Sequence, residues 1–484
     1  MFSNATGTKT QISLQQPTDA TMNQISEVSA NLPDSQLFEQ TGVLVWINKS
    51  TRKVERLDRQ SLSLWLRTYI TFIRYNAKGE ASDISMPSYR IVRACLELLP
   101  KQVPHLQTIY EHPIIMPDLS LRSEEGYYAD IESYIFDNSG ITDESIDSST
   151  ESLDRAKSIL SSDLLGEVLF KDTSAGTNYL AYLLTFAMRP AIEGNVPMFA
   201  INSSSMAIGK TYLLRTADMI WRNDDNASAL HIDAKVLNNT KSAYREVCFA
   251  LERNAESIYF DNMGPKPIRA NYLAPLLTDG RFQYKRPGET SLAKQTCQAI
   301  ISIAGNNLRF EKDLARRVYW CELEDFKMQF FEGDMLQYAK EHRISIIRSL
   351  FTLIKYWKDQ GAPRSEIVFQ SFNEWASIIG GILESVGIQH FLESSEDPEI
   401  TYMKRYCEAI YNEMGDGHFS VPEILDIISE DDHYLGSKNT DRSRTLRFGR
   451  LLSVYNDIQL GEYRISKSPS NTYPRKYRII KSAE

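Results

Sequence analysis

Three apolar segments that each end in polar residues give the clearest pattern along this chain. The first starts at Phe199 and leads into a loop of small residues, the second ends at Asp261 and Asn262, and the third ends at Asn306 and Asn307. Short apolar runs of this kind are typical of strands buried on both faces of a parallel sheet. Because such strands end at a common edge, we expect these polar ends to lie together. The pattern predicts an α/β fold with a polar site at one sheet edge.

The loop after the first strand has the layout of a phosphate-binding P-loop. Small residues are followed by Gly209, Lys210 and Thr211 at the expected start of a helix. In this layout backbone N–H groups surround phosphates, a lysine neutralises the β- and γ-phosphates, and a hydroxyl helps to hold Mg²⁺. Ser204 stands where the usual pattern has glycine, so an ordinary helix start is the alternative. The predicted contacts to ATP with Mg²⁺ are Ser204, Ser205, Met206, Ala207, Ile208, Gly209, Lys210, Thr211 and Tyr212.

The polar ends of the two later strands supply candidate partners for this loop. Asp261 is expected to hold the Mg²⁺ together with Thr211, and an amide from Asn306 or Asn307 is expected to orient the attacking water. The alternatives are an acid that simply ends a buried strand and a Gly-Asn turn. Order and spacing together favour the catalytic interpretation.

Two features bear on how catalysis would be completed. Asn262 completes the candidate catalytic set at the end of the second strand, but an amide cannot accept a proton from water. The catalytic base therefore stays open, with Glu246 and Glu252 as candidates. Arg316 and Arg317 follow the third strand, and one of them is expected to contact a phosphate bound to a neighbouring subunit. The alternative is that both are ordinary exposed surface residues.

Periodicity and composition divide the chain into six expected segments. Residues 164–188 are apolar on most faces, and stripes at 344–354 and 372–379 have helical spacing. Residues 137–154 are acidic, rich in Ser and nearly devoid of large apolar side chains. We expect a disordered lead at 1–36, an N-terminal α/β accessory domain at 37–136, an acidic linker at 137–157, a nucleotide-binding core at 158–330, a helical lid or connector at 331–400 and a C-terminal domain at 401–484.

Composition excludes several classes of protein. Hydrophobic residues make up 42% of the 484 residues, but no apolar run approaches the ~20 residues that cross a bilayer, so we expect no membrane contact. The five cysteines and seven histidines show no metal-ligand spacing, which predicts a cytoplasmic protein without structural zinc. The net charge of −9 means that any contact with nucleic acid must come from local basic patches.

One such patch lies at the C-terminal end. Between Lys438 and Lys481 eleven basic residues stand against three acidic ones, a net charge of +8. A capping-box start at Ser420 and Glu423, a second basic helix and two short strands follow one another in the order of a winged helix. The predicted DNA contacts are Arg442, Arg444 and Arg447 on the second helix and Lys467, Arg475 and Lys476 on the wing; the alternative is a solvated face.

These motifs together resemble a known family. The strand and loop from Asn195 to Thr211, the Asp261-Asn262 strand end, the stretch 276–281, the Asn306-Asn307 strand end with Arg316-Arg317, and the stretch 372–383 resemble the AAA+ helicases of phages and integrative mobile elements. These are of the primase-helicase C-terminal type and include the minichromosome-maintenance-like helicases of staphylococcal cassette elements. The resemblance implies an AAA+ P-loop ATPase core with an N-terminal α/β accessory domain and a C-terminal winged helix.

The same resemblance implies an activity. A hexameric ring would hydrolyse ATP between subunits and pump single-stranded DNA through its centre, and a hairpin with Tyr284, Lys285 and Arg286 would project into the channel. An ordinary exposed hairpin is the alternative. We expect an ATP-dependent DNA helicase of a mobile element, acting in replication on single-stranded and duplex DNA, with a primase or initiator as a further partner. The alternative, favoured by Asn262, is an ATP-regulated replication initiator or clamp that does not unwind DNA. A packaging or transposition ATPase is disfavoured, because no nuclease-type acidic cluster is evident.

Overall fold

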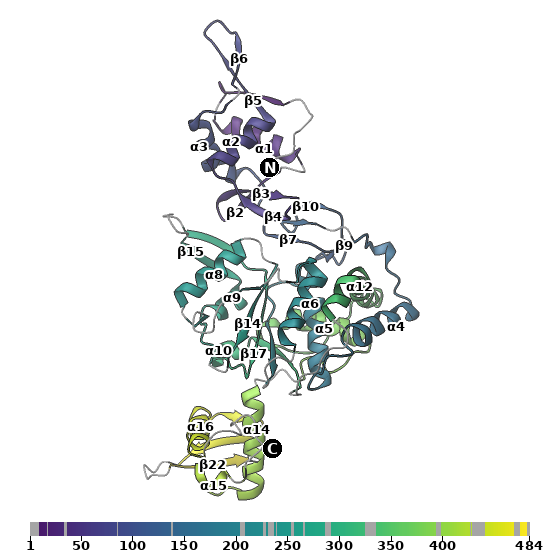
Figure 1. Ribbon diagram of the computed structural model, residues 1–484, viewed down its shortest axis with the longest axis vertical. Helices are drawn as coiled ribbons and strands as arrows, with labels where there is room; N and C mark the ends of the chain where they lie inside the picture. Colours follow the sequence, from purple (N-terminus) through teal and green to yellow (C-terminus); the bar gives the residue numbers. More distant parts are fainter. Residues whose placement is uncertain are drawn as a thin grey trace.

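The computed structural model describes most of the chain. The residues outside this description are 1–8, 17, 33–35, 85, 137–138, 204–208, 226–228, 231–236, 239, 253–255, 265–266, 286–291, 325–334, 394–397, 426, 428–440, 469–474 and 482–484. Figure 1 shows an N-terminal unit, a central unit around a parallel sheet, and a C-terminal unit that follow one another along the longest axis. In the described part of the chain, no helix is both long enough and apolar enough to cross a membrane.

The N-terminal unit combines three helices with a three-stranded sheet in the order β1-β5-β6. Its elements are β1 (Thr10–Ser13), α1 (Thr18–Ala30), α2 (Arg59–Tyr69), β5 (Ile70–Tyr75), β6 (Ala81–Ile84) and α3 (Tyr89–Leu98). The side chain of Asp58 caps α2 by accepting a hydrogen bond from the Ser61 N–H at 2.8 Å. Residues at helical spacing on α2 then face the core, namely Leu62, Trp65, Leu66 and Tyr69.

The prediction of a disordered lead at 1–36 is wrong for much of this segment. β1 pairs in parallel with β5, and the Ile12 side chain is buried between them and the helices. Met22 and Ile25 of α1 are buried in the same hydrophobic core. These few apolar residues suffice because α1 packs onto a surface that residues 37–99 supply.

Short strands connect this unit to the central unit. β2 (Leu37–Gln40), β3 (Val43–Asn48) and β4 (Lys53–Arg56) form one sheet. Beyond them lie β7 (Thr108–Tyr110), β8 (Ile114–Ile115), β9 (Leu121–Arg122), β10 (Gly126–Tyr128) and β11 (Ser133–Ile135). His112, between β7 and β8, is fully buried and its Nε2 lies 2.5 Å from the Glu256 carboxylate, which ties this region to the central unit.

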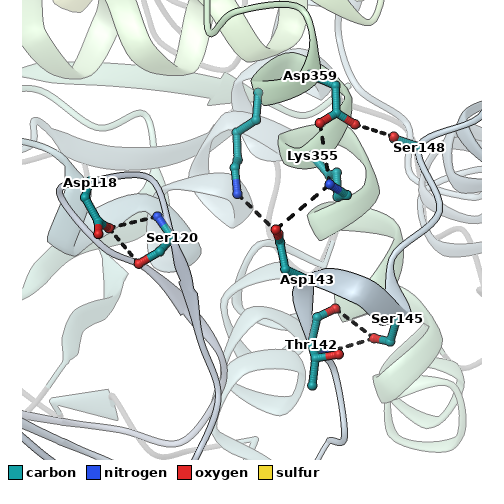
Figure 2. A network of polar contacts seen from close by, with 9 residues as sticks. Asp118, Ser120, Thr142, Asp143, Ser145, Ser148, Lys355 and Asp359 are labelled. Carbon is teal, nitrogen blue, oxygen red and sulfur yellow. Dashed lines mark hydrogen bonds and ion pairs between the residues drawn. The ribbon is translucent and has the colours of Figure 1, made fainter.

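The acidic, Ser-rich segment differs from the exposed linker that we expected. Figure 2 shows that its side chains meet α12 (Arg343–Asp359). Asp143 lies 3.2 Å from the Lys358 ammonium, and the Ser148 hydroxyl donates to the Asp359 carboxylate at 2.5 Å. Ile141 and Ile146 are buried in the central core. Two apolar anchors and basic partners on α12 therefore hold the segment that leads into α4 (Thr150–Ser158).

The central sheet contains five parallel strands in the order β13-β14-β17-β12-β18. They are β12 (Met198–Ser203), β13 (Ala229–Leu230), β14 (Ser257–Met263), β17 (Ile300–Asn306) and β18 (Val318–Glu322). The three predicted apolar strands are thus confirmed as β12, β14 and β17. The order places β17 between β12, which precedes the predicted P-loop, and β14, which carries Asp261. Local sequence patterns did not indicate this order.

Helices flank this sheet on both sides (Figure 1). They include α5 (Thr173–Met188), α6 (Lys210–Arg222), α8 (Thr240–Glu252), α9 (Leu273–Asp279), α10 (Lys312–Ala315), α11 (Met335–Glu341), α12 and α13 (Asn373–Ser385). All but two residues of the strongly apolar α5 are buried, as its sequence predicts. The predicted helical stripes of α12 and α13 belong to the same core, where the Trp375 indole donates to the Thr185 hydroxyl of α5 at 3.0 Å.

The C-terminal unit has its own hydrophobic core. It contains α14 (Pro398–Met414), β19 (Phe419–Ser420), α15 (Val421–Ile424), α16 (Asp441–Val454), β20 (Gln459–Leu460), β21 (Tyr463–Lys467) and β22 (Lys476–Lys481). The predicted capping box is confirmed, because the Ser420 N–H donates to the Glu423 carboxylate at 2.7 Å. The predicted hairpin is β21 and β22, within a sheet of order β19-β22-β21-β20.

Candidate active site

The candidate site begins where α6 starts, at the carboxyl edge of the central sheet. Gly209 has φ +88° and occupies the cap position before the first helical residue, Lys210. Only glycine adopts this left-handed conformation without steric cost, so Gly209 lets the chain turn sharply into the helix. Tyr212 lies half-buried in the first turn. The predicted contacts at 204–208 lie outside the described residues.

Lys210 and Thr211 each reach a different strand. The Lys210 ammonium is buried and donates to the Ser203 hydroxyl, at the end of β12, at 2.6 Å. The Thr211 hydroxyl donates to Oδ1 of Asp261, on β14, at 2.8 Å. The structure therefore brings together the two residues that the sequence nominated for Mg²⁺, although 50 positions separate them in the chain.

A β-bulge aims Asp261 toward α6. Phe260 pairs with Ile303 of β17 and Met263 pairs with Gly305, so β14 contains one extra residue at Asp261-Asn262. Asn262 has φ +56°, a conformation that Asn tolerates better than most residues, and its N–H donates to Asp261 Oδ1 at 2.7 Å. The bulge thus fixes the carboxylate oxygen that accepts from Thr211.

The end of β17 lies between the two halves of this site. The Asn307 N–H donates to the Ser203 carbonyl at 2.9 Å, beside the residue that holds Lys210. The Oδ1 atom of Asn306 is buried and meets no hydrogen-bond partner among the described residues. A Cβ at Gly305 would lie 2.4 Å from the Met263 carbonyl, so glycine is required for β17 to end this close to β14. The two predicted amides are therefore at the site, and one presents an unused acceptor.

Asn202 joins the ends of three strands, a feature that the sequence interpretation missed. Its Oδ1 accepts from the Leu308 N–H at 2.9 Å, just beyond the two amides of β17. Its Nδ2 donates to the carboxylate of Glu322, the last residue of β18, at 3.2 Å. Glu322 also pairs with Lys171. We call this arrangement the Asn202 clasp; the apolar run 318–321 that ends in an acid was the signal that could have revealed it.

The arginine pair lies at the opposite edge of the sheet. The Met198 N–H, at the start of β12, donates to the Arg317 carbonyl at 2.9 Å. Six strand residues separate this position from Lys210, which is roughly 20 Å at the usual rise per residue. Arg316 and Arg317 are therefore too far from the Lys210 of their own subunit to contact the same phosphate.

The two arginines differ in their surroundings. The Arg317 side chain is 11% exposed, and its Nε donates to the Thr278 hydroxyl at 2.8 Å. Hydrogen bonds from Arg317 and then Arg316 lower the pKa of Asp313, which keeps this carboxylate charged beside them. Arg316 is 55% exposed and is the more accessible of the two.

The candidate bases receive little support from their positions. Glu246 is exposed on α8, which packs against β15 (Arg281–Lys285). The side chain of Glu252 lies outside the described residues. Neither the Glu246 position nor the exposed Asn262 amide supplies a described proton acceptor next to Asp261.

Two predicted DNA contacts are buried. Tyr284 is 5% exposed and packs against Phe249 of α8 at 5.6 Å between ring centroids, because strand alternation turns it inward. Arg444 is 8% exposed, because it lies one helical turn before the buried Phe448 on the inner face of α16. Both side chains are therefore unavailable to DNA in this structure.

The remaining predicted DNA contacts fall into two groups. Lys467, Arg475 and Lys476 are exposed at the ends of the β21–β22 hairpin. The side chains of Lys285, Arg442 and Arg447, and the whole of Arg286, lie outside the described residues. The predicted hairpin that contains Tyr284 and Lys285 is present, with β15 paired to β16 (Leu292–Thr296).

Comparisons with known proteins add little to this geometry. No family model and no curated protein sequence matches the chain. Two solved apo structures of the NrS-1 C-terminal region are similar over 96% and 95% of this chain and 98% of theirs, with 12% and 11% identity and TM-scores of 0.37 and 0.39. Likeness this loose does not identify a function, which must be argued from the site itself.

Proposed function

We propose that this chain is a Mg²⁺-dependent ATPase of the AAA+ helicase type that acts on DNA. The observation that carries the proposal is the hydrogen bond between Thr211 and Asp261, beside the buried Lys210 ammonium. A helix start, a bulged strand and a third strand converge on one sheet edge, where doubly wound folds bind their ligands.

The residues present fit ATP with Mg²⁺. Hydroxyl and carboxylate oxygens are ligands that Mg²⁺ prefers, so Thr211 and Asp261 would hold the ion in place of their mutual hydrogen bond. Bound Mg²⁺ would neutralise negative charge on the phosphates. Lys210 would exchange Ser203 for a phosphate, and the unused Oδ1 of Asn306 would accept a hydrogen bond from the attacking water. The amide supplies orientation rather than proton abstraction.

The positions of the arginines support a site shared between subunits. Because Arg316 is exposed and lies at the edge opposite its own Lys210, it can contribute to catalysis only in a neighbouring copy. This favours an assembly in which each sheet edge faces the next subunit, as in the hexameric ring that the family resemblance implies. Mixing Arg316→Ala protein with Lys210→Ala protein should then restore part of the turnover that each lacks alone.

DNA contact is proposed for the wing of the C-terminal unit. Lys467, Arg475 and Lys476 are exposed there, together with Arg464 and Arg478 on the same hairpin. No acidic residue other than Glu462, which pairs with Lys481 at 3.1 Å, lies on the described strands and turns of 459–481. This hairpin surface is positively charged although the chain has a net charge of −9, so it is suited to contact the phosphates of DNA.

Isosteric substitutions on one helix test the ATPase proposal. Thr211→Val removes the hydroxyl that would bind Mg²⁺, and should lower Mg²⁺-dependent turnover by about 10–100-fold or more. Thr216→Val is the matched control, because this buried hydroxyl of α6 meets no partner among the described residues. The control should keep its activity and its stability. Equal turnover in the two variants, or full turnover in Lys210→Ala, would show that the site is not an ATPase site.

A second function is favoured by one residue. Asn262 stands beside Asp261 with an exposed amide that cannot accept a proton, which suits a protein that binds ATP to change its DNA affinity and hydrolyses it slowly. The chain would then be an initiator or clamp. A strand-displacement assay with ATP distinguishes the two: displacement by wild type but not by Thr211→Val supports the helicase, whereas ATP-dependent DNA binding without displacement supports the clamp.

A further inference from the structure

The N-terminal unit presents an aromatic and basic surface that the ATPase proposal does not use. Tyr89, at the start of α3, is 56% exposed, and Met86 just before it is 63% exposed. The Arg59 guanidinium, at the start of α2, lies 4.9 Å from the centroid of the Tyr89 ring. This cation–π contact joins the two helices, which Figure 1 shows in the same unit.

Basic residues flank this pair in the sequence. Arg90 follows Tyr89 on α3 and Arg56 precedes α2, and both are exposed. We define the Arg59–Tyr89 patch as Arg56, Asp58, Arg59, Met86, Tyr89 and Arg90, in which Asp58 is the one acidic member. Residues 37–105 contain eleven Lys and Arg against six Asp and Glu, a net charge of +5 on a chain of net −9. This region is therefore basic against an acidic background.

Single-stranded nucleic acid is the partner that suits this combination. An exposed tyrosine offers a face on which an unpaired base can stack, whereas bases in a duplex are already stacked. Guanidinium groups on either side can contact the phosphates that flank such a base. An exposed Tyr and Arg pair also occurs at protein interfaces, but the excess of positive charge favours a polyanion.

We propose that the Arg59–Tyr89 patch binds single-stranded nucleic acid, with a base on the Tyr89 ring and phosphates on Arg59 and Arg90. This gives the accessory region at 37–136 a role of its own. The proposal does not require ATP binding, so it stands or falls separately from the ATPase site.

Fluorescence anisotropy with labelled oligo(dT), without nucleotide, tests the proposal on the full chain. Tyr89→Ala should weaken binding about 5- to 150-fold, the range expected for loss of one base–aromatic stack, while Tyr89→Phe should bind like wild type. Arg59→Ala and Arg90→Ala should each flatten the slope of log K against log[salt] by about 0.7. Arg67→Ala is the control, because this exposed arginine lies in the last turn of α2, at the end opposite Arg59.

The C-terminal wing could mask these effects, so the same series is repeated with Lys467, Arg475 and Lys476 changed to Ala. Equal thermal unfolding of the Tyr89 variants would show that the fold is intact. Unchanged oligo(dT) affinity of Tyr89→Ala in both backgrounds would overturn the proposal and assign the patch to a protein partner. In the protein with the substituted wing, equal affinity for oligo(dT) and for a duplex, or equal losses in Tyr89→Ala and Tyr89→Phe, would also overturn it.

Discussion

The Asn202 clasp predicts a strong coupling between two residues at the ends of neighbouring strands. Asn202→Asp keeps an oxygen for the buried Leu308 N–H, but it places a second carboxylate where Nδ2 now donates to Glu322 at 3.2 Å. Two charges about 4 Å apart repel by roughly 4 kcal/mol at an effective dielectric constant of about 20. Movement of the side chains and uptake of a proton will relieve part of this repulsion.

A second substitution should reverse the damage. Glu322→Gln alone removes the ion pair with Lys171, whose side chain is 38% exposed, and should cost about 1 kcal/mol or less. Combined with Asn202→Asp, the glutamine amide can donate to the new carboxylate, so the hydrogen bond is restored in the opposite direction. We expect a favourable coupling energy of about 1–3 kcal/mol between the two substitutions.

Urea unfolding of the four proteins measures this coupling, and ATP turnover measures its consequence. Asn202→Asp should displace the turn that carries Asn306 and Asn307 from Ser203, and a shift of about 1 Å at such a site can cost about 100-fold in rate. Nucleotide affinity should change less, because Lys210 and Thr211 lie on α6. Additive effects of the two substitutions on unfolding would refute the clasp, even if the wild-type protein hydrolyses no ATP.

Three further predictions follow from the site and its surroundings. Arg316→Ala should lower ATP turnover by about 10³–10⁵ without loss of stability, whereas Arg317→Ala should lower thermal stability because it releases Thr278 and Asp313; equal activity of Arg316→Ala and wild type would contradict the shared site. Alanine at Lys467, Arg475 and Lys476 should reduce the slope of log K against log[salt] for duplex binding by up to about 3. ATP turnover should be unchanged. The hydrogen bond from His105 to Glu39 raises the pKa of His105 above 6.5. The stability that this pair contributes is therefore full below about pH 6.5 and is lost as the pH rises through the raised pKa. Urea unfolding across this pH range should show the loss in wild type but not in Glu39→Gln.

Local patterns predicted the strands of the site but not their order. The runs that end at Ser203, Asp261 and Asn306 are continuous apolar segments, which is what burial on both faces requires. Which strand lies in the middle depends on long-range packing, and nothing in the local sequence specifies it. The β-bulge at Asp261 could not be predicted from the sequence either, because the extra residue in β14 is recognised only from the pairing of β14 with β17.

Side-chain periodicity accounts for the burial of two predicted DNA contacts, Tyr284 and Arg444. Tyr284 and Lys285 are neighbours on one strand, so their side chains point to opposite faces and cannot form one DNA surface. Arg444 lies four residues before Phe448, so it shares the inner face of its helix with that apolar residue. By contrast, Met22 in the segment 1–36 is buried because residues far along the chain pack against it. The sequence of this polar, aperiodic segment does not indicate that packing.

The position of Asn202 suggests how the shared site and its neighbour would be coupled. Arg316 lies two residues before the start of β18, and Glu322 ends that strand, so a pull on the arginine by a neighbouring subunit's phosphate would act along β18 toward the clasp. At the clasp Asn202 bonds both to Glu322 and to the turn after Asn306 and Asn307. Because strands of a packed sheet shift as units rather than stretch, the state of one site would reach the amides of the next through this single side chain.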